Sequence, residues 1–176
     1  AAVAASGEGT LTFESVTGSG DAVALSGVKL TAADGTVSTA PSLAITGLAD
    51  RQPGGYTAVR MTFDQGSTVG HGDTITWQSG ALDDVVIPTV DEVKARQHVR
   101  LFRAISFANL NISGGHVSAP VDAATFSLDV GDMAEGAPTH VVLHATGVRL
   151  PAALLTNSVA SALISMLDYK EFVADI

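Results

Sequence analysis

Thr57-Ala58-Val59-Arg60-Met61-Thr62-Phe63 alternates apolar and polar side chains with a period of two. Successive side chains of a β-strand point to opposite faces of its sheet. The alternation therefore predicts a strand with Val59, Met61 and Phe63 on one face and the intervening polar residues on the other. A strand of this kind is typical of an antiparallel sheet with one apolar face.

The same pattern recurs on both sides of this stretch. Leu11 and Phe13 share one face of a strand that begins at Thr10, and Val23 and Leu25 share a face after a turn at residues 18–21. Asp34-Gly35 predicts a hairpin, because both residues tolerate a positive φ angle. After the turn at residues 70–73, a further strand places Ile75 and Trp77 on its inner face and ends near Ile87. Residues 9–48 and 57–87 are thus expected to be strands joined by turns.

The second half of the chain mixes strands with two expected helices. Thr89 followed by Glu92 forms a capping box, which predicts a helix over Thr89–Ala104. Proline suits the first position of a helix, so a second helix is expected over Pro151–Leu167. Alternation predicts further strands over residues 105–112, 125–130, 140–145 and 169–176.

These elements predict a mainly β fold, a curved antiparallel sheet that is either groove-like or sandwich-like, with two short α-helices. A chain of 176 residues is expected to form a single domain, residues 1–176, and the alternative is a fragment of a longer chain. Residues 9–48 and about 95–130 share a weak repeat of strand, glycine turn, Val-Ser strand and proline, and chance similarity explains it equally well.

Composition excludes several classes of function. Apolar residues make up 46% of the chain but aromatic residues only 5%, too few for a platform that stacks sugars or bases. A formal net charge of −9 argues against binding nucleic acid and against adhesion to an anionic membrane. The chain has no cysteine, which excludes disulfides, thiol catalysis and cysteine-ligated zinc.

No motif indicates catalysis or a bound cofactor. The chain has no phosphate-binding loop, nucleophile elbow, zinc-protease motif or calcium loop. His140 and His144 are expected on one strand about 13 Å apart, too far to bind one metal ion directly. We therefore expect no enzyme, no cofactor and no metal site. One enzymatic hypothesis remains, which ranks behind the two non-enzymatic ones given below. It is a hydrolase whose histidine, acid and hydroxyl are brought together only by folding.

Two clusters of charge have alternative interpretations. Arg96, Arg100 and Arg103 would share one face of the first helix, either as a docking face for an acidic partner or lipid headgroups or as a solvent face paired with the chain's own carboxylates. Asp83-Asp84 and Asp91-Glu92 would form either a calcium site or a solvated turn beside a helix N-terminus, and the second interpretation is preferred.

The strand rhythm resembles the periplasmic portions of AsmA-like and related uncharacterised proteobacterial envelope proteins. Leu25-Ser26-Gly27-Val28-Lys29-Leu30, followed by Asp34-Gly35, and Ala145-Thr146-Gly147-Val148-Arg149-Leu150 carry the resemblance. The resemblance covers about two-thirds of the chain, and it does not assign a function to any residue of this chain. It implies a long curved sheet with an apolar concave face, a role in lipid transport or envelope maintenance, and a periplasmic or otherwise exported location.

The sequence thus predicts a non-enzymatic, acidic envelope domain that binds an apolar ligand such as a lipid. An aliphatic groove poor in aromatic residues suits acyl chains better than sugars. Its expected ligand-binding residues are Leu11, Phe13, Ile75 and Trp77, and its partners are a lipid or apolar small molecule and a protein at the basic helix. The alternative is a structural or adhesion-type interaction module in which the same residues form a closed β core.

Overall fold

The computed structural model describes residues 9–52, 54–94, 100–115, 120–131, 141–151 and 171–174. These residues form one sheet of twelve strands and one short helix. The elements are β1 (Gly9–Thr12), β2 (Ser15–Ser19), β3 (Ala22–Ala32), β4 (Val37–Thr46), β5 (Ala49–Asp50), β6 (Tyr56–Gly70), β7 (Asp73–Ile87), α2 (Val90–Lys94), β8 (Ala104–Gly114), β9 (Val121–Val130), β10 (Val141–Thr146), β11 (Val148–Pro151) and β12 (Glu171–Ala174).

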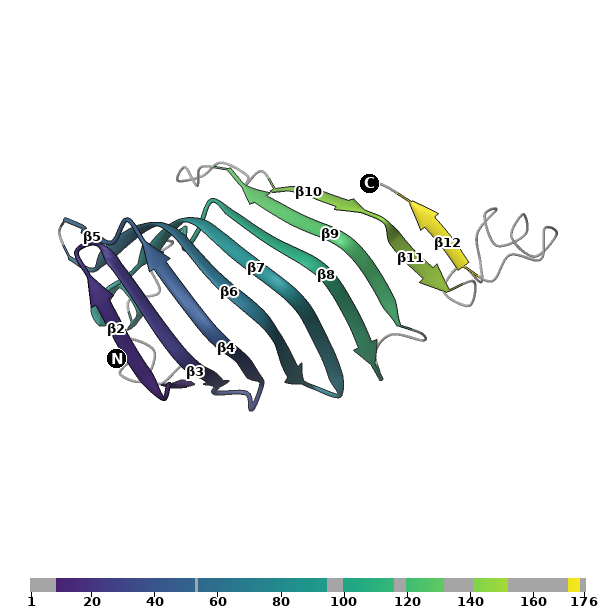
Figure 1. Cartoon of the computed structure of the whole chain (residues 1–176), viewed down its shortest axis with the longest axis horizontal. Helices are drawn as coiled ribbons and strands as arrows, with labels where there is room; N and C mark the ends of the chain where they lie inside the picture. The colour runs from purple at the N-terminus through teal and green to yellow at the C-terminus, as the bar shows by residue number, and fades with distance from the viewer. Residues whose placement is uncertain are drawn as a thin grey trace.

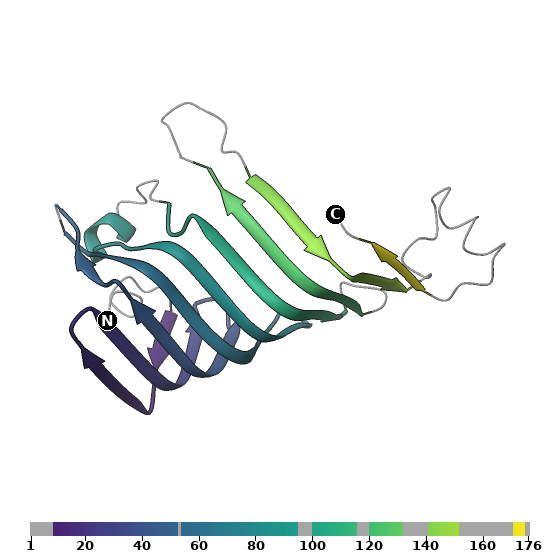
Figure 2. The ribbon, with the colours of Figure 1, turned by 45° about the horizontal axis from the view of Figure 1, so that its top comes forward.

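The sheet is an antiparallel meander in which most strands pair with the next strand along the chain. The main order is β1-β3-β4-β6-β7-β8-β9-β11-β12. At one edge β1 and β2 both pair with β3, and toward the other edge β10 and β11 both pair with β9. Figures 1 and 2 show these strands as one curved layer that does not close on itself. The predicted mainly β, curved antiparallel fold is confirmed.

Tight turns join the long strands where the sequence predicts them. The Asp34-Gly35 hairpin joins β3 to β4, with Gly35 at a φ of 87°. The turn between β6 and β7 has positive φ angles at His71 (53°) and Gly72 (86°). Because such short turns bring strand ends together at once, they fix the register of each hairpin.

A bend crosses the sheet at one level. The strand pairing is interrupted between Gly27 and Pro41, between Gln65 and Gln78, and between Asn109 and Ala124. Gly27, Asn109 and Gly147 have φ angles of 57°, 49° and 58° at this level. The register is the same on both sides of the gap, so the long strands β3, β4, β6, β7, β8 and β9 bend at this level without slipping against their neighbours.

The bend shifts the alternation of faces by one residue. Trp77 lies opposite Gly66 and Phe63 lies opposite Gly80, so strict alternation along β7 would put Trp77 and Phe63 on opposite faces. Their ring centroids are nevertheless 5.7 Å apart, in an edge-to-face contact. Apolar residues before and after the bend therefore share one face.

The first predicted helix, Thr89–Ala104, is confirmed at its beginning and is wrong at its end. The capping box is confirmed, because the Thr89 amide donates to Glu92 Oε2 at 2.8 Å and the Glu92 amide donates to Thr89 Oγ1 at 3.2 Å. The described part of helix α2 covers Val90–Lys94, residues 95–99 lie outside the described residues, and Ala104 begins β8. Leu101 and Arg103 form backbone hydrogen bonds with Val86 and Asp83 at the end of β7, so pairing with the sheet replaces helix there.

The second predicted helix and the predicted face of Val59 differ from the structure. Pro151 ends β11 and does not begin a helix, and the remainder of the second predicted helix lies outside the described residues. Val59 does not follow Met61 and Phe63, since pairing is interrupted between Val59 and Asp84 and Val59 is 65% exposed. Asp84 has a φ angle of 50°, which marks a second local bend.

Candidate ligand groove

Three uninterrupted rows of paired residues cross one face of the sheet, which we call the apolar face. The Met61 row contains Gly18, Val23, Ile45, Met61, Leu82, Ile105, Leu128 and Leu143. The Phe63 row contains Val16, Leu25, Leu43, Phe63, Gly80, Phe107, Phe126 and Ala145. The Leu11 row contains Leu11, Leu30, Ser38, Thr68, Ile75, Ile112 and Val121. No row contains a charged residue.

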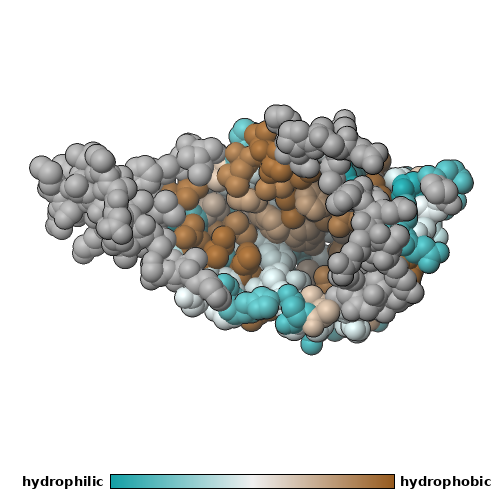
Figure 3. Space-filling model, turned by 180° about the vertical axis from the view of Figure 1, so that it is seen from behind, coloured by the Kyte–Doolittle hydropathy of each residue, from teal (hydrophilic) through white to brown (hydrophobic). Residues whose placement is uncertain are grey.

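An aromatic cluster lies in the middle of the apolar face. The ring of Phe107 lies 5.8 Å from that of Phe63, 5.5 Å from that of Trp77 and 6.3 Å from that of Phe126, measured between centroids. Tilted and edge-to-face contacts at these separations are favourable beyond the burial of area. Figure 3 shows a hollow on this side of the molecule in which hydrophobic residues gather.

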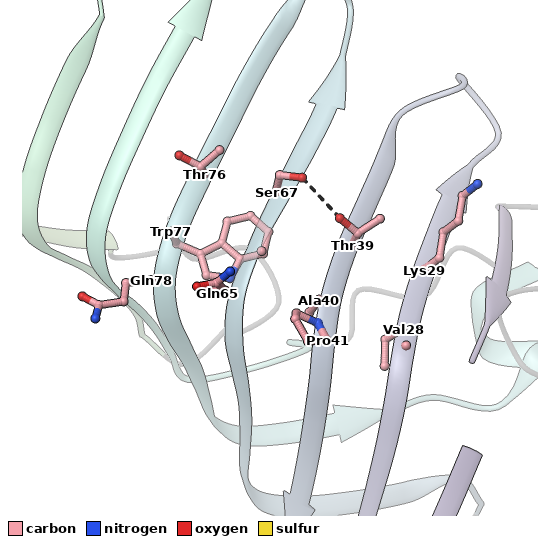
Figure 4. A pocket seen from close by; sticks show the side chains of 12 residues that line it. Val28, Lys29, Thr39, Ala40, Pro41, Gln65, Ser67, Thr76, Trp77 and Gln78 are labelled. Carbon is pink, nitrogen blue, oxygen red and sulfur yellow. Dashed lines mark hydrogen bonds between the residues drawn. The ribbon is translucent and has the colours of Figure 1, made fainter. Parts of the chain in front are cut away.

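Trp77 is held in place at the bend. Its indole Nε1 donates a hydrogen bond of 2.9 Å to the backbone oxygen of Asp64. Its ring covers Gly66, where an added Cβ would lie 2.7 Å from the indole and 2.3 Å from the Thr39 oxygen. Figure 4 shows the indole reaching from β7 over β6. Gly66 is therefore required for the ring to lie against the backbone.

The apolar face is incompletely buried. Its buried apolar side chains are small or of medium size, such as Ala123, Ala145 and Leu110. Val16 remains 56% exposed and Leu143 46% exposed. Among the described residues no second layer of strands or helices covers this face. The geometry is thus that of an open trough, within the part of the chain that the structure describes.

A pocket of about 740 Å³ lies along β3, β4, β6 and β7 at the bend. Its walls include the apolar-face residues Val28, Ala40 and Trp77 together with polar neighbours such as Gln65 and Gln78 (Figure 4). Ligand pockets for small molecules fall within this range of volume.

Three of the four predicted ligand-binding residues, Leu11, Ile75 and Trp77, lie on the apolar face, whereas Phe13 lies between β1 and β2 and not in the predicted strand with Leu11. Ile75 and Trp77 pack against the buried cluster of Leu110, Ala123, Ala145 and Val148. Leu11 and Phe13 lie at the opposite edge, where Leu11 pairs with Leu30. The sequence reasoning did not select the aromatic cluster partners Phe107 and Phe126 of Trp77. The alternation of Phe107 and Phe126 with Ser106 and Ser127 indicates that the two rings lie on an apolar face. The sequence does not indicate the shift of faces at the bend, which brings Phe107 to Trp77.

Charged groups lie along the other face and its ends, mostly in pairs. Arg60 contacts Asp83 at 2.7 Å, Arg51 contacts Glu92 at 2.5 Å, and Arg103 contacts Asp84 at 2.6 Å. The hydrogen bond from Arg51 lowers the pKa of Glu92, and the bond to Asp84 raises the pKa of Arg103. These carboxylates thus pair with arginines and do not converge on a calcium site.

The predicted basic docking face is not formed as expected. Arg103 pairs with Asp84 and lies 3.6 Å from Asp129, and Arg100 donates to the backbone oxygen of Val130 at 3.4 Å. Both residues follow the end of α2, so they do not share a helical face, and Arg96 lies outside the described residues.

The histidines do not assemble a metal site with the described residues. His71 Nε2 lies 3.1 Å from Asp34 Oδ2 across two neighbouring turns. The amide of Thr36, and then His71, hydrogen-bond the Asp34 carboxylate and lower its pKa to about 2. His144 is exposed on β10, and His140 lies outside the described residues. No group of three or more potential ligands occurs among the residues that the structure describes.

Comparisons with known proteins give no family assignment: no family model matches the chain, and neither a curated protein nor a solved structure is significantly similar to it. Among the described residues, none of the helical structure has the length and hydropathy of a membrane span.

Proposed function

We propose that the chain is a non-enzymatic envelope domain that binds the acyl portion of a lipid, or another elongated apolar molecule, along the apolar face. The observation that supports this is the continuous apolar face itself, which carries no charge in its three rows and includes large exposed side chains. The periplasmic or otherwise exported location in this proposal rests on the resemblance to AsmA-like proteins.

The chemistry of the face favours acyl chains. Removing apolar area from water contributes about 25 cal/mol per Å², so an uncovered aliphatic trough gains free energy when hydrocarbon covers it. Soluble monomers rarely leave large contiguous apolar patches uncovered. The aromatic cluster offers a rigid central contact, while most other residues of the Met61 and Phe63 rows are Val, Leu and Ile, which match flexible chains without directional bonds.

A structural or adhesion-type module is the second candidate. It is favoured by the same exposure, because a partner protein could cover the apolar face as readily as a lipid does. The two candidates differ in what accompanies the purified protein.

The test is native mass spectrometry of the purified protein, followed by organic extraction and lipid analysis. We expect a near-stoichiometric lipid adduct that is lost on extraction and regained after incubation with phosphatidylcholine vesicles. Phe107→Asp, at the centre of the aromatic cluster, should reduce the adduct at least tenfold. The matched control is Ser106→Asp, the preceding residue on the other face, which should retain it.

Circular dichroism separates loss of binding from loss of folding in both variants. A wild-type mass that stays free of adduct before and after vesicle incubation would contradict the proposal. Equal loss of the adduct in Phe107→Asp and Ser106→Asp would also contradict it, because the two side chains lie on opposite faces.

A further inference from the structure

We infer that the two edges of the sheet are complementary and that copies of this chain join edge to edge, with β10 of one copy pairing with β2 of the next. The inference concerns the sheet edges and does not depend on what occupies the apolar face. Figure 1 shows β2 and β10 on opposite sides of the sheet.

The strand directions allow this pairing. At the level of β2 and β10, eight strand positions run antiparallel from one edge to the other: β2, β3, β4, β6, β7, β8, β9 and β10. β12 adds a ninth position only at the level of β11. Because the number of positions at the level of β2 and β10 is even, these two strands point in opposite directions. A second copy placed beside the first in the same orientation therefore presents its β2 antiparallel to β10, as every other pair in the sheet is.

The two edges also match in level and in face. The Met61 row begins at Gly18 on β2 and ends at Leu143 on β10, and the Phe63 row begins at Val16 and ends at Ala145. Continuing the rows would therefore bring Val16 beside Ala145 and Gly18 beside Leu143 of the neighbouring copy. The Met61 and Phe63 rows would then pass from copy to copy, whereas at the level of the Leu11 row β12 occupies the position beside β11.

The β10 edge lacks the features that keep strand edges apart. Natural proteins protect edges with lysine, proline, inward charges or bulges. β10 contains none of these, and Val141, Val142 and Leu143 are 53%, 48% and 46% exposed. At the other edge, β2 contains no charge and Val16 is 56% exposed.

Within the described part of the chain, the outward backbone groups of β10 have no strand partner. The Val130 amide donates to the Arg103 oxygen on the β8 side at 2.7 Å. Hydrogen-bonding direction alternates along an antiparallel strand, so Val142 and His144 bond to β9 while Val141 and Leu143 direct their amide and carbonyl groups away from it. None of the residues that the structure describes pairs with that side of β10.

A joint of this kind is heterologous, because two different edges meet. Such contacts form open chains of subunits unless the rotation between copies closes a ring. We therefore expect the mean mass of the protein in solution to rise continuously with concentration, without a plateau at the dimer.

The register supplies a specific test on the polar face. A row there begins at Thr17 on β2 and ends at His144 on β10, and both residues are exposed. Across the joint Thr17 of one copy would face His144 of the next. The double variant Thr17→Lys/His144→Lys places like charges opposite each other, which destabilises a strand pair. The double variant Thr17→Lys/His144→Glu places opposite charges there.

The measurement is sedimentation velocity at pH 8 from about 1 to 200 μM, with circular dichroism as a control for folding. We expect wild-type association to increase with concentration, the Lys/Lys variant to weaken it at least tenfold, and the Lys/Glu variant to restore it in low salt. A wild-type protein that stays monomeric throughout would overturn the inference. The inference would also be overturned if the Lys/Lys and Lys/Glu variants changed the strength of association by the same factor. Lipid adducts should be unaffected in both variants, which separates this result from that for the proposed function.

Discussion

At the scale of single residues, local contacts set both the packing of the apolar face and the chemistry of the turns. Gly66 leaves room for the Trp77 indole against the backbone, and the indole nitrogen bonds to Asp64. At the turns, the Asp34 carboxylate accepts from the Thr36 amide at 2.8 Å and contacts His71 of the neighbouring hairpin. Asp34 thus joins two turns that are distant in sequence.

The pH dependence of stability follows from Asp34. Its pKa is lowered from 3.8 to about 2 in the folded state, so its carboxylate contributes stability above the unfolded value. That contribution is lost as the pH falls through the window from about 4 to about 2. We expect the difference in melting temperature between wild type and Asp34→Asn to be largest at pH 5 and to shrink toward pH 2. A difference that stays constant from pH 5 to pH 2 would show that ionised Asp34 has no role.

At the scale of elements, the transverse bend determines how the strands present their side chains. The long strands β6 and β7 contain fifteen residues each. A strictly alternating strand of that length would expose part of its apolar set on the polar face. The bend shifts the alternation at one level in every strand, so a single apolar face continues from the Leu11 row to the Met61 row.

Asn109 tests the energetic role of the bend. Its φ angle is 49°, a conformation that glycine adopts freely and that a β-branched residue resists. Both Asn109→Gly and Asn109→Val remove the hydrogen bond to Gln78, so the difference in stability between them does not include that bond. In urea unfolding we expect Asn109→Val to be less stable than Asn109→Gly by about 1–2 kcal/mol. Equal stability of the two variants would mean that the bend does not require this φ angle.

At the scale of the whole molecule, the described residues form a single layer whose strands are supported mainly by their neighbours. A sheet normally buries its apolar face against another layer. Here the central strands have a partner on both sides, whereas β2 and β10 have a partner on one side only. Stability should therefore fall from the centre of the sheet toward its edges.

Hydrogen exchange measures this gradient. At low micromolar concentration we expect the slowest amide exchange in β6, β7 and β8 and the fastest in β2 and β10. Each central strand must lose two ladders of hydrogen bonds before its amides open, and an edge strand loses one. Slow exchange in β10 equal to that in β7 would contradict a free edge at that concentration.

Local alternation and turn chemistry determined the strands, the Asp34-Gly35 hairpin, the Thr89–Glu92 cap and the mainly β class. They also placed Leu11, Ile75 and Trp77 on an apolar face, because alternate residues of a strand point to the same face. The same prediction for Phe13 does not hold, since β1 ends at Thr12. Only the tertiary structure decided three features. The first is the level at which the alternation of faces shifts by one residue. The second is that Leu101 and Arg103 bond to β7 and are not helical, and the third is that Phe107 contacts both Trp77 and Phe126. All three depend on neighbours far away in sequence, whose hydrogen bonds and contacts outweigh the local preferences of the chain.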